Sequence, residues 1–337
     1  MSNDQCFLVT GASGTIGRAF LEELAVKQNL KVRAQVRNKR ATRASIGQTV
    51  DLTKVDLVEA DFTRCLEQDY EKLVSGVDTI IHAGGLVHNP NATYQEFDVV
   101  NTRATLALAQ AASLKKVQNM IFLSTAGVYG NGPFTNITET SELKPVTPYA
   151  SSKLACENVL KNFTNSIPNI IIFRIGLVYG PGDRGNVLTL IKEIKHSRYL
   201  QIGKGDTLKS MIYANDVAKA ILDTIYRSSQ NPGFNIYNLA NPNPVSIKIL
   251  TEDIAQILKI SKKIQSLPEP LISFGVKAAQ ALLREKSPVS VDQLKKLTTT
   301  TTLSMQNLQK ILPSIPQTQL TEGLEKEITW AKENNLI

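Results

Sequence analysis

The stretch Thr10–Gly17, which reads TGASGTIG, follows a short apolar run and opens a helical pattern. Gly11 permits a tight turn, Gly14 lets the backbone approach a pyrophosphate, and Gly17 allows a helix to pack closely on a strand. The free N–H groups and the dipole of a helix N-terminus favour phosphate at such a turn. The spacing therefore predicts a dinucleotide-binding turn. Its expected cofactor-binding residues are Gly11, Ser13, Gly14, Thr15, Ile16 and Gly17.

Short apolar runs alternate with longer helical patterns around this turn, which is typical of βαβ units and a parallel sheet. The runs are rich in Val, Ile and Phe and predict strands at Cys6–Thr10, Val32–Val36, Val55–Ala60, Thr79–Ala83, Asn119–Ser124 and Ile170–Ile175. Helices are expected at Thr15–Lys27, Tyr94–Leu114 and Pro148–Asn162. We therefore predict an α/β fold: a Rossmann-type, doubly wound parallel sheet with a smaller, mostly helical C-terminal substrate lobe.

The domain boundaries follow from where this alternation stops. Residues 1–175 are expected to form the dinucleotide-binding domain, and 211–240 to return to it with the apolar run Phe234–Leu239. The substrate lobe would then comprise 176–210 and 241–337.

Two local patterns stand out in that lobe. Leu200–Gly203 and Lys209–Tyr213 are expected to pair as a hairpin, because turn-forming residues separate them. The threonine run Thr298–Thr302 is β-branched and favours a short strand over a helix.

Composition bounds the functional class. The chain has 337 residues, 42% of them hydrophobic, and carries 38 Lys and Arg against 30 Asp and Glu, for a net charge of +8. No apolar stretch is long enough to span a membrane and no secretory signal opens the chain, so we expect a cytoplasmic protein without an integral membrane segment. The three cysteines and three histidines have no metal-ligand spacing, which predicts no metal site. The basic residues accompany no nucleic-acid-binding motif, and the charge suits a ligand with several phosphates instead.

The second predicted strand bears on cofactor choice. Proteins that bind NAD usually place an acid near its end to hold the ribose 2′-hydroxyl. This strand continues instead into Arg37, whose guanidinium can bind a 2′-phosphate. The sequence therefore favours NADP(H) over NAD(H).

Tyr149 and Lys153 are four residues apart, so a helix would place them on one face. An ammonium group near a phenol favours the phenolate and lowers the pKa of the tyrosine. A tyrosine tuned in this way can move the proton of a hydroxyl while a nicotinamide carries the hydride. Alone, such a pair is common by chance.

Further motifs accompany it, and together they resemble the extended short-chain dehydrogenase/reductase family over about 240 residues in the right order. The matching segments are TGASGTIG, Asp61 after the third strand, IHAGG at 81–85, Asn101, STAGVYG at 124–130, YASSK at 149–153, and Arg174 through GLVYGPG at 176–182. The resemblance implies four catalytic residues: Thr125 to hydrogen-bond the substrate oxygen, Tyr149 as acid/base, Lys153 as its electrostatic partner, and Asn101 in a proton relay. It also implies cofactor contacts at Asp61, Phe62, Ala83, Gly84, Gly85, Tyr149 and Lys153.

Departures from the family pattern narrow the reaction. Sugar-nucleotide 4,6-dehydratases of this family carry an Asp-Glu pair where this chain has Ala126-Gly127, which disfavours dehydration. Leu177 stands where many 4-epimerases have an asparagine, and it resembles the ketoreductase branches. Asn186 and Lys209 occupy positions that resemble diphosphate ligands of nucleotide-sugars, although lysine lacks the fork of an arginine.

The leading expectation is an NADPH-preferring 4-ketoreductase of a nucleotide-diphosphate sugar, with Tyr149 as acid/base. The alternative is a UDP-sugar 4-epimerase with tightly bound NAD. A hydroxysteroid- or dihydroflavonol-type ketone reductase and a non-catalytic cofactor-binding protein remain further alternatives. A homodimer is possible, and His82 and His88 are expected to be ordinary loop residues.

Overall fold

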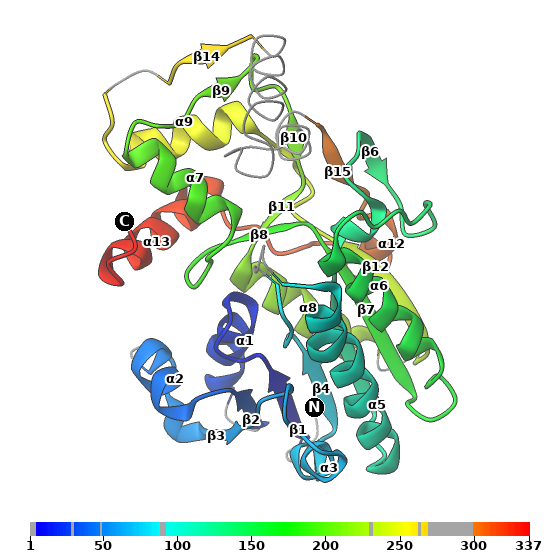
Figure 1. Cartoon of the computed structure of the whole chain (residues 1–337). Helices are drawn as coiled ribbons and strands as arrows, with labels where there is room; N and C mark the ends of the chain where they lie inside the picture. The colour runs from blue at the N-terminus through cyan, green and yellow to red at the C-terminus, as the bar shows by residue number, and fades with distance from the viewer. Residues whose placement is uncertain are drawn as a thin grey trace.

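The computed structural model describes residues 5–27, 30–47, 49–87, 92–228, 232–261, 264–268 and 299–337. Seven parallel strands form its central sheet (Figure 1), in the order β12-β7-β5-β4-β1-β2-β3. They are β1 Gln5–Thr10, β2 Leu30–Val36, β3 Val55–Glu59, β4 Thr79–His82, β5 Asn119–Thr125, β7 Asn169–Ile175 and β12 Phe234–Leu239. The predicted Rossmann-type sheet is confirmed, because all six expected strands are present and the chain returns to the sheet at β12.

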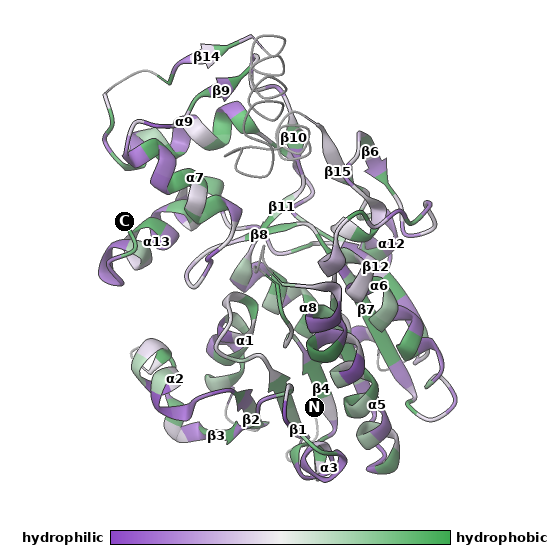
Figure 2. Ribbon diagram, in the orientation of Figure 1, coloured by the Kyte–Doolittle hydropathy of each residue, from purple (hydrophilic) through white to green (hydrophobic). Residues whose placement is uncertain are grey.

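Helices cover both faces of this sheet, which explains its apolar strands: all seven residues of β7 are buried. One face carries α1 Thr15–Ala25 and α8 Ala214–Ser228, which pack on each other. The other carries α3 Glu67–Val74, α5 Ala104–Leu114 and α6 Pro148–Lys161. Figure 2 shows the resulting pattern, with hydrophobic strands inside and hydrophilic residues on the outer sides of the helices. Shorter elements of this region are α2 Lys39–Ile46, η1 Leu52–Lys54 and η3 Ala126–Tyr129.

The helix predicted over Tyr94–Leu114 is interrupted. It begins as α4 Tyr94–Phe97, widens into a π-helical segment η2 Asp98–Arg103, and continues as α5. Such widened turns often occur at functional sites. Here the segment contains Asn101, one of the predicted catalytic residues.

The lobe beyond the carboxyl ends of the strands has its own apolar core. Three helices, α7 Asn186–Lys195, α9 Ile247–Ile257 and α13 Leu320–Glu333, pack together through fully or nearly fully buried aliphatic side chains. The remaining short elements of the described residues are β6 Phe134–Ile137, β8 Leu177–Tyr179, β9 Gln201–Ile202, β10 Leu208–Lys209, β11 Met211–Tyr213, β13 Val245–Ser246, β14 Ser266–Leu267, β15 Thr301–Leu303 and α12 Gln306–Gln309. Of these, β6, β15 and α12 pack against the core of the central sheet.

The predicted hairpin of Leu200–Gly203 with Lys209–Tyr213 is wrong. β9 pairs in parallel with β14, β10 pairs with β13 and β15, and β11 pairs with β8. The physical reason lies in the connecting turn, where the carbonyls of Gly205 and Thr207 accept hydrogen bonds from the start of α9 and so hold this segment away from β9. The strand expected within the threonine run is present as β15, although residue 298 lies outside the described residues.

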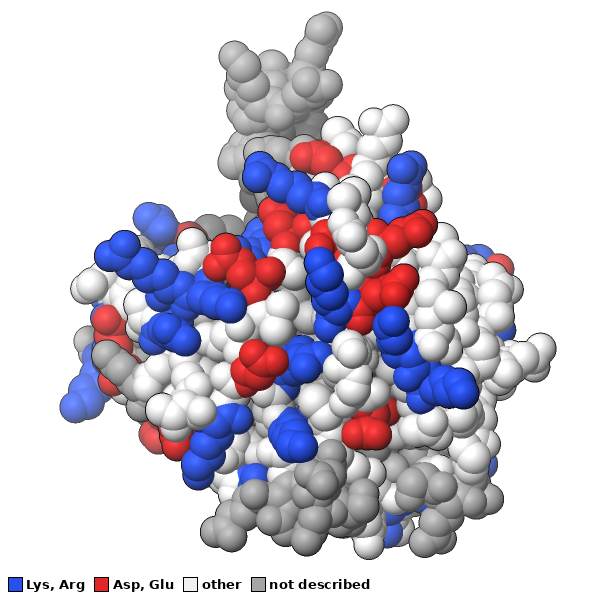
Figure 3. All heavy atoms as spheres, turned by 90° about the horizontal axis from the view of Figure 1, so that it is seen from below, with Lys and Arg blue, Asp and Glu red and all other residues white. Residues whose placement is uncertain are grey.

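On the face seen in Figure 3, basic and acidic side chains are interspersed, without a continuous basic surface. Among the described helices, none is both long and apolar enough to cross a membrane.

Candidate active site

The predicted site residues meet beyond the carboxyl ends of β1, β4 and β5. The strand order reverses between β1 and β4: β2 and β3 lie on one side of β1, and the later strands, from β4 to β12, lie on its other side. In doubly wound sheets the crevice at such a reversal is where ligands bind. The glycine-rich turn follows β1, the Ala83–Gly85 turn follows β4, and Thr125 is the last residue of β5.

The glycine-rich turn has the close approaches that the sequence predicts. Gly11 has φ +62°, and a Cβ there would lie 2.6 Å from the Cα of Gly84. A Cβ on Gly17 would lie 2.2 Å from the carbonyl oxygen of Gly11. No side chain caps α1 at its N-cap residue Gly14, so the first N–H groups of the helix are available to an anion. Ser13, exposed, and Thr15 and Ile16, half-buried, complete the turn.

Gln35, in β2, helps to hold the glycine-rich turn, a role that the sequence did not predict. Its buried side chain accepts a hydrogen bond from the N–H of Gly11 at 2.8 Å and donates one to the carbonyl of Ala60 at the end of β3. It thereby joins the glycine-rich turn to the segment that precedes Asp61. The sequence carried little signal for this role, because Gln35 is one of three polar residues that alternate with apolar ones along β2.

Arg37 and Asp61 lie where the prediction placed them, after β2 and β3. Arg37 is exposed. Asp61 accepts hydrogen bonds from the N–H and the hydroxyl of Thr63, at 3.0 and 2.9 Å, and these bonds, with the charges of Arg64 and Arg37, lower the pKa of its carboxyl. Phe62 stacks on a neighbouring tyrosine ring with centroids 5.5 Å apart.

His82 is not a loop residue, in contrast to the prediction. It ends β4, is fully buried, and its ring nitrogens lie 2.7 Å from the hydroxyl of Thr10 and 3.0 Å from that of Thr105. Burial, aided by the charge of Lys153, lowers the pKa of His82 to about 3, so the ring is neutral at working pH. The Thr10 hydroxyl also accepts from the N–H of Gly84, so His82 supports the turn that follows β4. His88 lies outside the described residues.

Asn101 connects three segments of the site. Its side chain is 2% exposed, accepts from the N–H of Leu86 at 2.7 Å, and donates to the carbonyl of Leu86 at 3.1 Å and the hydroxyl of Ser152 at 2.9 Å. Gly85 lies close by, since a Cβ there would be 2.8 Å from the Asn101 side-chain oxygen. Asn101 therefore fixes the 83–86 turn against α6.

Thr125, Tyr149 and Lys153 are brought together as the resemblance implied. Pro148 and the side-chain cap of Thr147 start α6 so that Tyr149 is its second residue and Lys153 follows one turn later. Thr125 ends β5, and its side chain forms a hydrogen bond with that of Tyr149. The buried ammonium of Lys153 donates to the carbonyl of Leu123 at 2.8 Å.

The predicted lowering of the Tyr149 pKa includes the positive charge of a bound nicotinamide, and the chain alone has the opposite effect. Burial raises the pKa of the phenol above its usual value, and the hydrogen bond with Thr125 offsets only part of that effect. Lys153 directs its ammonium to the strand carbonyl instead and lies 4.6 Å from the centroid of the Phe122 ring. Burial also lowers the pKa of Lys153.

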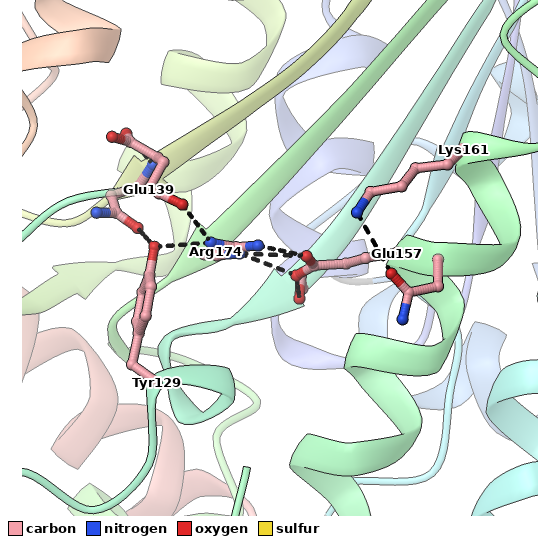
Figure 4. Close-up of polar contacts among 8 residues, drawn as sticks. Tyr129, Glu139, Glu157, Lys161 and Arg174 are labelled. Atoms are coloured by element: carbon pink, nitrogen blue, oxygen red, sulfur yellow. Dashed lines mark hydrogen bonds and ion pairs between the residues drawn. The ribbon is translucent and has the colours of Figure 1, made fainter. Parts of the chain in front are cut away.

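A buried ion pair joins α6 to β7 (Figure 4). Arg174, from β7, binds both carboxylate oxygens of Glu157 through Nε and Nη2, the shortest contact being 2.7 Å, and both side chains are at most 3% exposed. Arg174 also donates to the hydroxyl of Tyr129 at 3.1 Å and to the carbonyl of Glu139 at 2.9 Å. Glu157 lies one turn beyond Lys153, so this pair fixes the helix that carries the tyrosine and lysine.

The two predicted substrate ligands lie in the lobe on different elements. Asn186 is the exposed first residue of α7. Lys209, in β10, donates through Nζ to the carbonyl of Thr299 at 2.6 Å, and burial lowers the pKa of Lys209 to about 8. Leu177 opens β8, and the Ala126-Gly127 dipeptide begins η3 directly after Thr125.

Comparisons with known proteins agree with this geometry. Residues 7–240 match the model of the NAD dependent epimerase/dehydratase family. An N-acetyl-alpha-D-glucosaminyl-diphospho-ditrans,octacis-undecaprenol 4-epimerase of Escherichia coli O157:H7 is 27% identical over 97% of this chain and 95% of its own. The uncharacterized protein YbjS of Escherichia coli K12 is also 27% identical, over 98% of both chains. A crystal structure of UDP-glucuronic acid 4-epimerase from Bacillus cereus with NAD superposes with a TM-score of 0.79 at 21% identity, over 98% of this chain and 99% of that one.

Because the family model covers more than half of the chain, this protein is an enzyme of the NAD-dependent epimerase/dehydratase family, in the extended short-chain dehydrogenase/reductase group.

Proposed function

We propose that the enzyme inverts C4 of a sugar carried on a diphosphate, using a bound nicotinamide cofactor. The observation that carries this proposal is the position of Thr125 and Tyr149, whose side chains interact directly beside Ala126-Gly127, where no carboxylate is available. An acid/base without a second acid suits reversible oxidation at one carbon better than elimination of water. The relative that acts on an undecaprenyl diphosphate sugar, which this chain matches over nearly its full length, favours the epimerase over the ketoreductase expectation.

The chain's own residues fit a dinucleotide. The uncapped helix α1 and the glycines whose Cβ atoms would clash form a cradle for a pyrophosphate. Asp61 and Phe62 would contact the adenine half, and Ala83–Gly85 and Lys153 the half that bears the nicotinamide. The nicotinamide supplies hydride acceptance and return.

Tyr149 would exchange the proton of the C4 hydroxyl, and Thr125 would hold the same oxygen by a hydrogen bond. Tyr149 would accept this proton as the phenolate when C4 is oxidised and return it as the phenol when C4 is reduced. Burial raises the pKa of Tyr149 in the chain alone, and the positive charge of a bound nicotinamide would lower it towards the phenolate. Lys153 and Asn101 position Tyr149 and Thr125. Lys153 binds a carbonyl near the end of β5, and Asn101 binds the hydroxyl of Ser152 on α6.

For the substrate, we propose that Asn186 and Lys209 bind the diphosphate. Asn186 stands in the first turn of α7, where N–H groups and the helix dipole favour an anion. Lys209 supplies a positive charge from β10. We assign both to a substrate lobe made of 176–210 and 241–337.

A second candidate function is an NADPH-dependent 4-ketoreductase, and Arg37 is the observation that favours it. Its exposed guanidinium follows β2 and can bind a 2′-phosphate. We therefore also propose that the enzyme accepts NADP(H) at least as well as NAD(H).

We propose a homodimer as well, on the observation that α5 exposes Leu106 at 38% and Leu114 at 68%. Light scattering on the purified protein would measure its mass. A monomeric mass at micromolar concentration would contradict this part of the proposal.

The reaction is tested by incubating the purified protein with UDP-glucose, UDP-N-acetylglucosamine, UDP-glucuronic acid and undecaprenyl diphosphate N-acetylglucosamine in separate assays. Proton NMR of the sugar after acid release distinguishes the two C4 epimers. We expect interconversion of one pair without consumption of added cofactor. Stoichiometric consumption of NADPH by a 4-keto sugar, with no interconversion, would establish the reductase instead.

A further inference from the structure

Glu327 is a buried carboxyl group that the proposed reaction does not use. It lies in the C-terminal helix α13 and is 0% exposed. One oxygen, Oε2, accepts a hydrogen bond from the N–H of Gly180 at 2.8 Å. The other, Oε1, is buried and has no hydrogen-bond partner among the described residues. A carboxylate in that position would keep only one of the several hydrogen bonds that its charge requires.

Gly180 begins the loop 180–185, which runs from β8 to α7 and packs against the phosphate-binding turn. Two residues further on, Gly182 has φ +93°, and a Cβ there would lie 3.3 Å from the Cα of Thr15. Thr15 is the first residue of α1, at the turn predicted to bind the pyrophosphate. Glu327 therefore anchors the start of a loop whose middle lies against the cofactor cradle.

The other end of this loop carries a second acid. Asp183 is 6% exposed and accepts from the N–H groups of Gly185 at 2.9 Å and Leu188 at 3.4 Å, so it also holds the start of α7. Among the described residues, the titratable groups that act on Glu327 are Asp183 in the loop and Tyr179 on β8. The negative charge of Asp183 opposes a second negative charge on Glu327.

We propose that Glu327 is a positioning residue that acts as an uncharged acid: its neutral carboxyl group holds Gly180, and with it the loop 180–185, against the phosphate-binding turn, and its ionisation requires this loop to open so that water reaches the carboxylate. In agreement with this, burial and the charge of Asp183 raise the pKa of Glu327 to about 9. The proposal concerns the loop and the cofactor cradle only. It therefore holds whichever reaction the enzyme performs.

The sign of the pH effect follows from proton counting. Between about pH 5 and 9 the folded chain keeps a proton on Glu327 that the unfolded chain has lost, so folding becomes less favourable as pH rises. This group alone would change the folding equilibrium by up to about tenfold per pH unit in that range. Glu327→Gln retains an acceptor for Gly180 but cannot ionise, so it removes this dependence.

The experiment compares urea unfolding of the wild type, Glu327→Gln and Glu327→Met at pH 5, 7 and 9. Glu325→Gln is the matched control, because it makes the same change at an exposed position of the same helix. We expect the folding constant of Glu327→Gln, relative to wild type, to increase with each pH step, while that of Glu325→Gln stays constant. Parallel pH curves for Glu327→Gln and wild type would overturn the proposal.

Binding of NADH, followed by its fluorescence, separates positioning from stability. The wild type should lose about fivefold in affinity between pH 7 and 9.5, and Glu327→Gln should lose less than twofold. Glu327→Met keeps the volume but loses the acceptor, so its affinity should be about fivefold lower at both pH values. If Glu327→Met binds NADH as the wild type does, the residue does not position the loop. Neither readout requires sugar turnover, so failure here is distinct from failure of the proposed reaction.

Discussion

Tyr149 is the residue to which we assign the proton transfer, and its environment makes that assignment testable. Tyr149→Phe removes the phenolic hydroxyl but keeps the ring that packs near Phe97, with centroids 6.2 Å apart. We expect turnover to fall by about 10²–10⁴-fold, the usual contribution of a positioned acid or base. Steady-state assays with the substrate found by NMR measure this loss.

The dinucleotide affinity of Tyr149→Phe should stay within about twofold of wild type, because removal of one peripheral hydroxyl costs little binding. Thr147→Ala is a useful comparison, since it removes the cap of the same helix without touching the phenol. A Tyr149→Phe enzyme with near wild-type turnover would remove the tyrosine from the mechanism.

Arg37 carries the proposed cofactor preference. Arg37→Asp replaces the guanidinium with a carboxylate that repels a 2′-phosphate and can bind a ribose hydroxyl. A charge-assisted contact contributes about 1.5–3 kcal/mol, so the ratio of NADPH to NADH affinity should fall by at least about tenfold. Arg227→Asp makes the same charge change at an exposed position near the end of α8 and should leave that ratio unchanged. Equal ratios in wild type and Arg37→Asp would make Arg37 a surface residue only.

The turn between β1 and α1 is an element whose shape depends on the absence of side chains. Gly11 and Gly76 have similar left-handed φ values, +62° and +68°, but a Cβ on Gly76 would meet no atom within 4 Å. Gly76→Ala should therefore lose roughly 1 kcal/mol of stability through backbone strain, and Gly11→Ala should lose more, because its Cβ also clashes with Gly84. Only Gly11→Ala should lose dinucleotide affinity, by more than about tenfold, because its Cβ displaces Gly84. Thermal unfolding and NADH titration measure the two effects, and equal NADH affinities would contradict a cradle at this turn.

The same elements show how far the sequence could predict the site. Glycine spacing and β-branched runs report local geometry, so the first turn, the strands and the start of α6 were predictable. The partners of His82 and Asn101 were not, because they come from segments 23 and 15 residues away along the chain. The predicted pairing of the small strands in the lobe failed for the same reason: β10 pairs with β15, about 90 residues later, and no local sequence pattern indicates such a pairing.

At the scale of the whole molecule, the structure links the lobe to the cofactor site through the loop 180–185. The loop starts at β8, touches α1 at Thr15, and is held by α13 through Glu327. A cofactor enclosed by the sheet edge on one side and this loop on the other would dissociate slowly. Slow release suits an epimerase, which must return the hydride to the same sugar, and is unfavourable for a reductase, which must exchange its cofactor in every turnover.

This linkage predicts the state in which the enzyme is purified. We expect it to contain close to one dinucleotide per chain, measured by absorbance and by cofactor count after acid release. The bound dinucleotide should also stabilise the fold, by about 2.7 kcal/mol at a hundredfold excess over its dissociation constant, because it binds only the folded chain. The Gly11→Ala variant is the control, since it should be purified empty. A wild-type protein that is purified without dinucleotide and turns over only with added NADPH would establish that the loop opens in each cycle, and would favour the ketoreductase over the epimerase.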